Sequence, residues 1–165
     1  MTHRVVLIAV CLLVVAAPQA DAFDLNLSVG ADFGGDFDLG DISVSADTGY
    51  SLGLEIAFTV PFVELGAGLE YGLSRGAKSF DFSASYYHLY GIGRMYFGPM
   101  YIAARLGYHD VSFSGLFDGS VDGGSTWALG GGVEFFEKVK LELLFNNLGG
   151  DLSYQSWTIR ALYTF

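Results

Sequence analysis

The chain has 165 residues, enough for a single domain. It carries 8 basic and 18 acidic residues, for a formal net charge of −10, yet 52% of its residues are hydrophobic and its mean hydropathy is +0.41. The acidic balance argues against a nucleic-acid partner, because phosphate recognition depends on Lys and Arg. After residue 22, no segment has the roughly 18 consecutive apolar residues of a transmembrane helix.

Residues 1–22 have the features of a cleavable secretory signal. One cation precedes the apolar run Val5–Ala17, and the segment ends in the pattern Ala20-Asp21-Ala22. The run is shorter than the roughly 20 residues that a membrane-spanning helix needs. We therefore expect cleavage after Ala22 and a mature domain that spans residues 23–165.

Cysteine usage agrees with export of a protein without disulfides. The single cysteine, Cys11, lies within the apolar run and follows Val10 rather than a small residue, so a lipoprotein anchor is disfavoured. The expected mature domain contains no cysteine, which argues against a small secreted domain held together by disulfides.

From Phe23 onward, apolar residues recur at every second position, the period of a β-strand with one apolar face. No stretch has the 3.6-residue period of an amphipathic helix. Eight segments follow the alternation: residues 25–33, 50–59, 63–74, 87–97, 100–109, 127–136, 139–146 and 156–165.

The connections between these segments alternate in length. Residues 60–62, 97–99 and 136–138 form tight links, whereas the links near 34–47, 75–81, 110–124 and 147–153 are longer, polar and rich in Gly and Asp. Short turns at one end and longer loops at the other are typical of transmembrane barrels, with the short turns on the periplasmic side. We predict an all-β fold, an eight-stranded antiparallel up-and-down transmembrane β-barrel.

The polar faces of the predicted strands carry charges of both signs. Nine charged residues lie on these faces: Glu55, Glu64, Glu70, Arg94, Arg105, Glu134, Lys140, Glu142 and Arg160. Many of the glycines share the same faces, and small residues suit a narrow interior that already holds long side chains. A lipid-facing Arg or Lys near the membrane midplane costs about 2–4 kcal/mol. We therefore expect these residues inside a side-chain-filled lumen, as a charge network toward the periplasmic half that acts as a plug.

Aromatic residues concentrate toward the strand ends, as expected of two girdles at the membrane interfaces. One set lies at the tight-turn end: Phe58, Phe62, Phe97, Phe135, Tyr163 and Phe165. The other set lies nearer the longer loops: Tyr71, Tyr87, Tyr108, Trp127, Phe145 and Trp157.

The C-terminus resembles the last strand of bacterial outer-membrane proteins. A final aromatic residue and apolar residues at every second position make up this pattern: Trp157, Ile159, Ala161, Tyr163 and Phe165. The segment Gly91–Tyr108 and the run Gly130–Glu134 are similar to small OmpA/OmpX-like barrel domains. The resemblance implies the outer membrane of a Gram-negative-type bacterium, surrounded by lipid and lipopolysaccharide, and recognition of the last strand by the barrel-assembly machinery. No pattern singles out an external partner.

The chemistry-bearing residues do not form an enzyme pattern. Some eight-stranded barrels modify lipid A, and the deacylases among them place His and Ser two residues apart on one strand, an arrangement that is missing here. His88 and His109 are expected to be packing and hydrogen-bonding residues of the lumen. We expect no catalytic residues.

Cofactor and metal motifs are also missing from the sequence. The acidic loops do not match a calcium-binding loop, and there is no phosphate-binding loop, dinucleotide-binding pattern or Cys/His cluster. We therefore expect no cofactor and no metal.

The sequence thus favours a non-catalytic integral outer-membrane barrel with a structural or surface-interaction role. A lipid A-modifying barrel enzyme and a soluble lipocalin-like ligand-binding barrel remain as alternatives.

Overall fold

The computed structural model describes residues 23–39, 42–77, 80–115, 119–121, 123–149 and 153–165. The expected signal segment, residues 1–22, lies outside these ranges. Among the described residues, no helix is long and apolar enough to cross a membrane.

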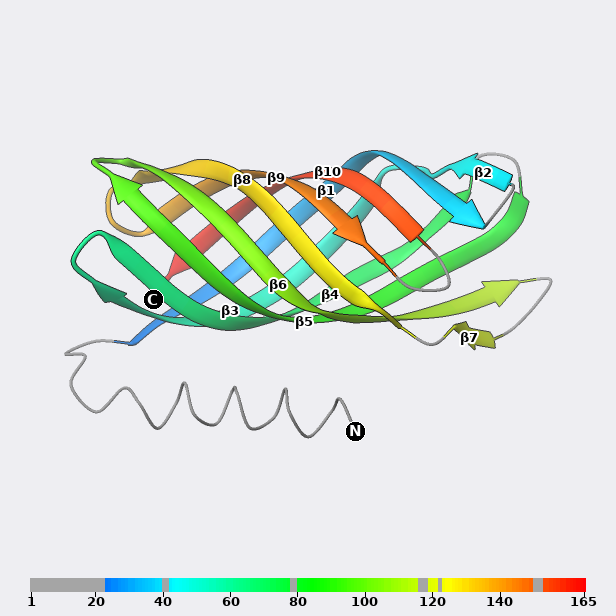
Figure 1. Cartoon of the computed structure of the whole chain (residues 1–165), viewed down its shortest axis with the longest axis horizontal. Coiled ribbons are helices and arrows are strands. Elements are labelled where there is room, and N and C mark those ends of the chain that lie inside the picture. The colour runs from blue at the N-terminus through cyan, green and yellow to red at the C-terminus, as the bar shows by residue number, and fades with distance from the viewer. Residues whose placement is uncertain (1–22, 40–41, 78–79, 116–118, 122, 150–152) are drawn as a thin grey trace.

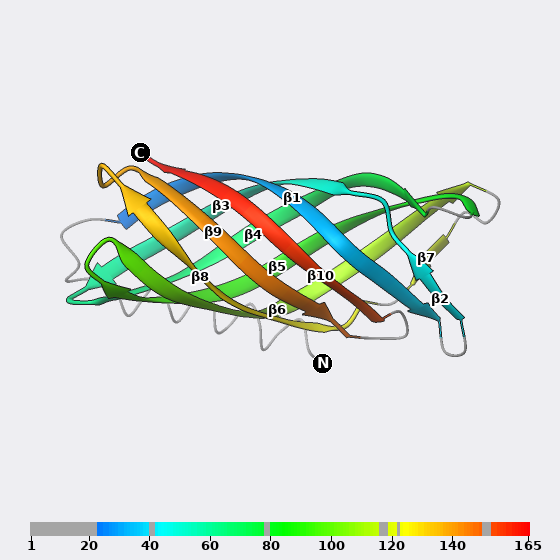
Figure 2. The same cartoon turned by 90° about the horizontal axis from the view of Figure 1, so that it is seen from above.

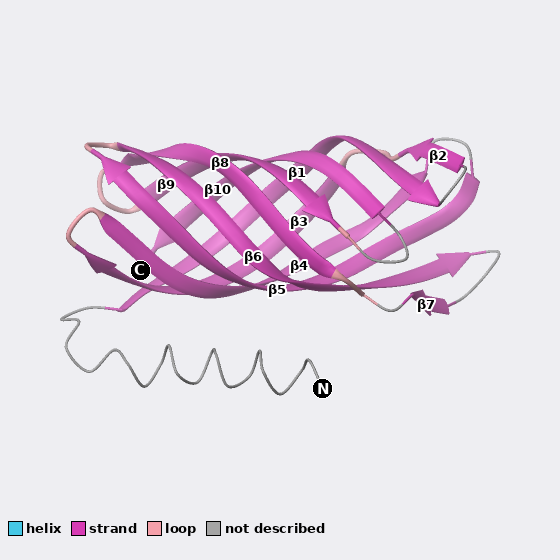
Figure 3. Ribbon diagram, viewed as in Figure 1, coloured by secondary structure: helices cyan, strands magenta, loops and turns pink. Residues whose placement is uncertain are grey.

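The described chain is built from ten strands, which make up nearly all of it (Figure 3). They are β1 (Phe23–Leu39), β2 (Ile42–Ser45), β3 (Gly49–Val60), β4 (Val63–Ala77), β5 (Phe80–Phe97), β6 (Met100–Gly115), β7 (Gly119–Val121), β8 (Ser125–Phe135), β9 (Val139–Leu148) and β10 (Ser153–Thr164).

Eight of these strands close into an antiparallel barrel. Sequential strands pair in the order β1, β3, β4, β5, β6, β8, β9 and β10. Pairing of β1 with β10, from Asn26 opposite Thr164 to Asp38 opposite Ser153, closes the sheet on itself. Figures 1 and 2 show the strongly tilted strands around one long axis. The predicted eight-stranded up-and-down barrel is confirmed.

Three tight turns and the C-terminus lie at the same end of the barrel (Figure 1). The turns use left-handed backbone conformations: φ is 70° at Phe62, 68° at Gly98, 55° at Phe136 and 61° at Glu137. Phe136 and Glu137 are the central residues of a β-turn that the Lys138 N–H closes on the Phe135 carbonyl at 3.3 Å, and positive φ at both positions is the turn geometry whose twist matches that of antiparallel strands. Glycine suits this conformation at Gly98, whereas Phe62 and Phe136 adopt it despite their side chains.

The strands at the opposite end are longer than the alternation predicted. β1 continues to Leu39 and pairs with β2, and β6 continues to Gly115 and pairs with β7. Residues that we expected in the long links therefore belong partly to strands. The physical reason is that hydrogen bonds between the backbones of neighbouring strands do not require apolar side chains. The hairpins therefore continue in polar sequence beyond the apolar belt of the barrel.

The apolar residues face outward and the charged residues face inward. Ile102, Leu129 and Ile159 are 53%, 57% and 52% exposed, whereas Glu55 and Arg160 on the opposite faces are fully buried. This inside-out arrangement leaves a continuous apolar belt around the barrel. The predicted orientation of the strand faces is confirmed.

Aromatic side chains border this belt at both ends. Near the loops, Phe145 lies between Trp127 and Trp157, with ring centroids 5.8 and 5.4 Å away. Near the tight turns, the rings of Tyr163 and Phe165 are 5.0 Å apart, edge to face. Both predicted girdles are therefore present, as in barrels that meet two membrane interfaces.

The exposed belt leads to a direct prediction. Ile102→Arg would place a cation on the outer surface, and it should lower the unfolding free energy in lipid vesicles by about 2–4 kcal/mol. Denaturant titration with refolding into vesicles measures this loss, and Ile102→Val is the matched control. Equal stability of the two variants would mean that this face does not contact acyl chains.

Candidate functional site

The lumen brings together eight of the nine charged residues that the sequence placed inside. Strand alternation turns each of them inward, and all are buried. They comprise four anions and four cations: Glu55, Glu64, Glu70 and Glu142 with Arg94, Arg105, Lys140 and Arg160. We call these eight residues the lumenal network. Its formal charges cancel.

Arg94 on β5 makes the shortest ion pairs of the three arginines in the network. Its Nη2 lies 2.7 Å from Glu55, its Nε lies 2.6 Å from Glu142, and its Nη1 donates to Glu64. All three guanidinium nitrogens therefore bind a different carboxylate. Such charge-assisted contacts, made in a fixed planar geometry, order the side chains around them.

Two carboxylates connect the three arginines. Glu142 on β9 contacts Arg94, Arg105 at 3.2 Å and Arg160 at 3.0 Å. Glu55 on β3 contacts Arg94 at 2.7 Å, Arg160 at 2.9 Å and Arg105 at 3.6 Å. Because β3, β5, β6, β9 and β10 each contribute a member, the network links strands across the whole lumen.

The network extends toward the loops through Glu70 on β4. Its Oε2 lies 3.4 Å from Arg105 Nη1 and 3.4 Å from Arg160 Nε. The Arg105 guanidinium also lies 4.5 Å from the centre of the Tyr90 ring, a cation–π contact. Arg105 is therefore held by a carboxylate and by an aromatic ring.

Toward the tight turns, the network ends at Glu64 and Lys140, whose Nζ donates to Glu64 at 2.5 Å. Glu134, the ninth predicted residue, is half-buried beyond this pair and lines the barrel mouth. None of the ion pairs seen in the described chain includes Glu134. The structure therefore places it beside the network rather than within it.

Four inward tyrosines support the carboxylates, and sequence reasoning did not identify them. Each donates to a network carboxylate: Tyr86 to Glu70, Tyr90 to Glu55, Tyr96 to Glu64 and Tyr101 to Glu142. The spacing of three of these tyrosines along their strand could have identified them. Tyr86, Tyr90 and Tyr96 are separated from Arg94 by even numbers of residues, so they share its face of β5.

Inward glycines make room for these rings. A Cβ at Gly68 would lie 2.6 Å from the Tyr90 ring, and one at Gly132 would lie 2.5 Å from the Tyr101 hydroxyl. Both distances are too short for a side-chain carbon. The glycines that we assigned to the lumen therefore accommodate tyrosine rings as well as charged side chains.

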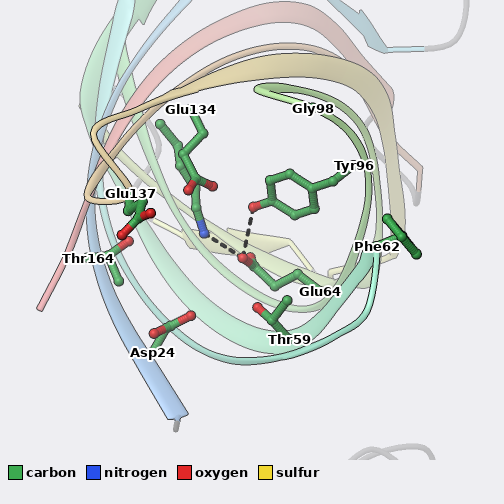
Figure 4. A pocket seen from close by; sticks show the side chains of 10 residues that line it. Asp24, Thr59, Phe62, Glu64, Tyr96, Gly98, Glu134, Glu137 and Thr164 are labelled. Carbon is green, nitrogen blue, oxygen red and sulfur yellow. Dashed lines mark hydrogen bonds and ion pairs between the residues drawn. The ribbon is translucent and has the colours of Figure 1, made fainter.

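A pocket of about 340 Å³ opens at the tight-turn end (Figure 4). Glu64 lies in it and accepts from both Lys140 and the Tyr96 hydroxyl, as the dashed lines show. Carboxylates, hydroxyls and aromatic rings line the wall: Asp24, Thr59, Phe62, Tyr96, Glu134, Glu137 and Thr164. The pocket is therefore acidic, and the lumenal network closes it toward the barrel centre.

The loop end of the lumen is closed by different contacts. Tyr86, Val111, Leu148 and Tyr154 belong to a buried apolar cluster. Below it, Thr158 donates to Asp32 and accepts from Asn146. Polar and apolar layers together seal this end.

His88 and His109 lie on the lumen side of β5 and β6, as the sequence suggested, and both are buried. His88 Nε2 lies 2.6 Å from the Thr126 hydroxyl. Across the described residues, no group of three or more His, Cys, Asp or Glu side chains is arranged to hold a metal ion.

The glycine contacts yield a matched pair of substitutions. Gly68→Ala should destabilise the barrel by about 1–3 kcal/mol, because the buried Tyr90 ring has no space to move away. Gly91→Ala is the control, since it faces outward and its nearest heavy atom would be 3.8 Å away. Denaturant unfolding of both variants tests the expectation, and an equal effect would argue against tight packing around Tyr90.

Comparison with known protein families gives no matching family model, and comparison with curated proteins gives no matching sequence. The fold does match solved structures. Neisserial surface protein A aligns with a TM-score of 0.61 and 15% identity over 88% of this chain and 100% of its own. Ail of Yersinia pestis, solved with the heparin analogue sucrose octasulfate, aligns with a TM-score of 0.56 and 16% identity over 87% and 99%. The N-terminal barrel domain of Pseudomonas aeruginosa OprF aligns with a TM-score of 0.51 and 14% identity over 85% and 97%.

At these identities the likeness concerns the fold. The suspected resemblance to small OmpA/OmpX-like barrels is confirmed at that level. The chain is a closed eight-stranded antiparallel barrel with the architecture of outer-membrane proteins.

Proposed function

We propose that this protein is a non-catalytic barrel of the bacterial outer membrane, with a structural or surface-interaction role. The observation that carries the proposal is the pairing of an apolar outer belt with a charge-balanced lumen. Lipid would solvate the belt, and lipopolysaccharide would surround the loop end. The barrel then serves as a stable platform that presents its loops outside.

The filled lumen supports a platform rather than a channel. An eight-stranded barrel has an interior just wide enough for side chains. Here the three arginines and their carboxylates contact one another across it, and aromatic residues pack on both sides. A continuous water path would require these buried ion pairs to separate, which is costly without new partners.

One contact in the lumen could support the enzyme alternative. The Thr126 hydroxyl and His88 Nε2 are 2.6 Å apart, a distance at which an imidazole can act as a base toward a hydroxyl nucleophile. Both groups are buried inside the barrel, however, while acyl chains would lie against its outer belt. The pair therefore supports a lumenal hydrogen bond better than lipid chemistry.

The soluble-barrel alternative conflicts with the exposed surface. A lipocalin-like protein buries its apolar face, whereas Leu54, Leu106 and Leu143 of this barrel point outward. An exposed apolar surface of this extent marks a membrane or protein contact. The outward leucines thus favour the membrane protein.

The loops suggest a ligand preference different from that of Ail. Ail was solved with a polysulfated sugar. The loop regions of this chain carry nine aspartates against Arg75 and Lys78. Acidic loops repel polyanions, so the surface role proposed here does not include a heparin-like ligand.

Envelope fractionation tests the proposed location. The protein should remain with the outer-membrane fraction after salt washing and should dissolve in detergent, with a mobility shift on heating in gels as the barrel unfolds. Recovery as a water-soluble monomer without detergent would contradict the proposal.

The last strand supports a proposed interaction with the barrel-assembly machinery. Deletion of Phe165 should reduce the amount of folded protein in the outer membrane, because it removes the end of the terminal apolar pattern. Phe136→Ala is the control, since Phe136 is also exposed at this end but lies outside the pattern. Immunoblots of heat-shifted and unshifted bands measure the effect, and equal folded levels would argue against this role of Phe165.

A further inference from the structure

The pocket at the tight-turn end of the barrel carries more negative than positive charge. Four carboxylates and one ammonium group line it, a formal charge of −3: Asp24, Glu64, Glu134 and Glu137 with Lys140. The charge of Glu64 is already matched, since Arg94 and Lys140 both pair with it. In the part of the chain that the structure describes, none of the other three carboxylates takes part in an ion pair. We call Asp24, Glu134 and Glu137 the rim carboxylates.

Backbone hydrogen bonds fix the rim of the pocket. The Thr164 N–H donates to the Lys138 carbonyl at 2.8 Å, which ties the turn that carries Glu137 to β10. The Glu134 N–H donates to the Pro99 carbonyl at 2.7 Å, which ties β8 to the turn between β5 and β6. The pocket is therefore formed before any ligand arrives, as most small-molecule sites are.

An aromatic ring faces the rim carboxylates. Figure 4 shows them on one side of the opening and the Tyr96 ring on the other. The Tyr96 hydroxyl donates to Glu64 at 3.0 Å, and its ring centre lies 5.1 Å from that of Tyr101, so the ring is held in place. An aromatic ring offers an apolar surface to methylene groups and attracts cations to its face.

The arrangement of the rim carboxylates does not suit a single small ion. Metal ions need their oxygen ligands within about 2.0–2.6 Å. Across the described ranges, no three His, Cys, Asp or Glu side chains are arranged to hold one metal ion. A matching ligand therefore carries its positive charges apart from one another, on a flexible chain. The pocket volume of about 340 Å³ is near the lower end of the range for small-molecule sites, about 300–1,000 Å³.

We propose that this pocket binds an aliphatic polyamine, a linear chain with two or three ammonium groups. The ammonium groups pair with the rim carboxylates, and the methylene groups lie against the Tyr96 ring. A cleft lined by charges of one sign raises the local concentration of ligands of the opposite sign. Glu64 and Lys140 stay paired at the floor, so binding leaves the lumenal network closed. That the pocket opens to the periplasm rests on the proposed function, whereas the binding itself does not.

Calorimetry with spermidine tests the proposal on the protein purified from membranes in nonionic detergent at low salt. One spermidine should bind per chain, and triethylene glycol, an uncharged chain of similar length, should not bind. Asp24→Asn, Glu134→Gln and Glu137→Gln should each weaken binding by about two- to fivefold, the effect of losing one exposed ion pair. The triple variant should weaken binding by about tenfold or more, because the separate losses multiply.

A matched triple variant at the opposite end separates a site from general attraction to an acidic protein. It removes three exposed carboxylates near the loops: Asp36→Asn, Asp47→Asn and Asp110→Asn. This variant should bind spermidine as the wild type does. Loss of as much affinity as in the rim triple variant would show that the attraction is general, and the proposal would be wrong.

Two further measurements use only the wild-type protein. In amide NMR spectra, spermidine should shift the signals of Glu134, Glu137 and Thr164 and leave that of Asp47 unchanged. A capped trilysine peptide should bind more weakly than spermidine, because its backbone is too bulky for so small a pocket. No spermidine binding, shifts confined to the loop end, or tighter binding of the peptide, which would point to a lysine of a protein partner, would each overturn the proposal.

Discussion

The structure depends on the requirement that charges taken into a narrow, closed interior find partners of opposite sign. An uncompensated ion in such an interior costs several kcal/mol. The barrel meets this requirement with four carboxylates and four cations, in which Glu55 and Glu142 each contact three arginines. Because the members come from six different strands, pairing of the charges and closure of the barrel are coupled.

The same constraint explains residues that carry no charge. Carboxylates shared among arginines still have lone pairs to satisfy, and tyrosines such as Tyr90 and Tyr101 supply the donors. Their rings fit only because glycines such as Gly68 and Gly132 lie beneath them. The apolar belt outside and the glycine-lined lumen inside are therefore two consequences of one inside-out packing scheme.

Much of this could be predicted from the sequence, since period-two alternation encodes both strand identity and strand face. Leu129 and Glu142 were assigned to the correct faces for this reason. The individual ion pairs could not be predicted, because barrel shear decides which inward residues meet, as when Arg94 of β5 reaches Glu142 of β9. The ends of β1 and β6 were placed too early, since polar hairpins show no apolar alternation. Tyr90 was missed because both faces of its strand are aromatic.

The most direct test of the central claim is the unfolding free energy of Arg94→Met in detergent or lipid, measured against wild type, with the exposed Glu137→Gln as the control. Arg94 binds three buried carboxylates, so its loss leaves Glu55, Glu64 and Glu142 short of counter-charge. The account predicts a loss of about 3–5 kcal/mol for Arg94→Met, the cost of breaking a buried ion pair, and little change for the control. Equal stability of the two variants would show that the lumenal network does not hold the barrel together.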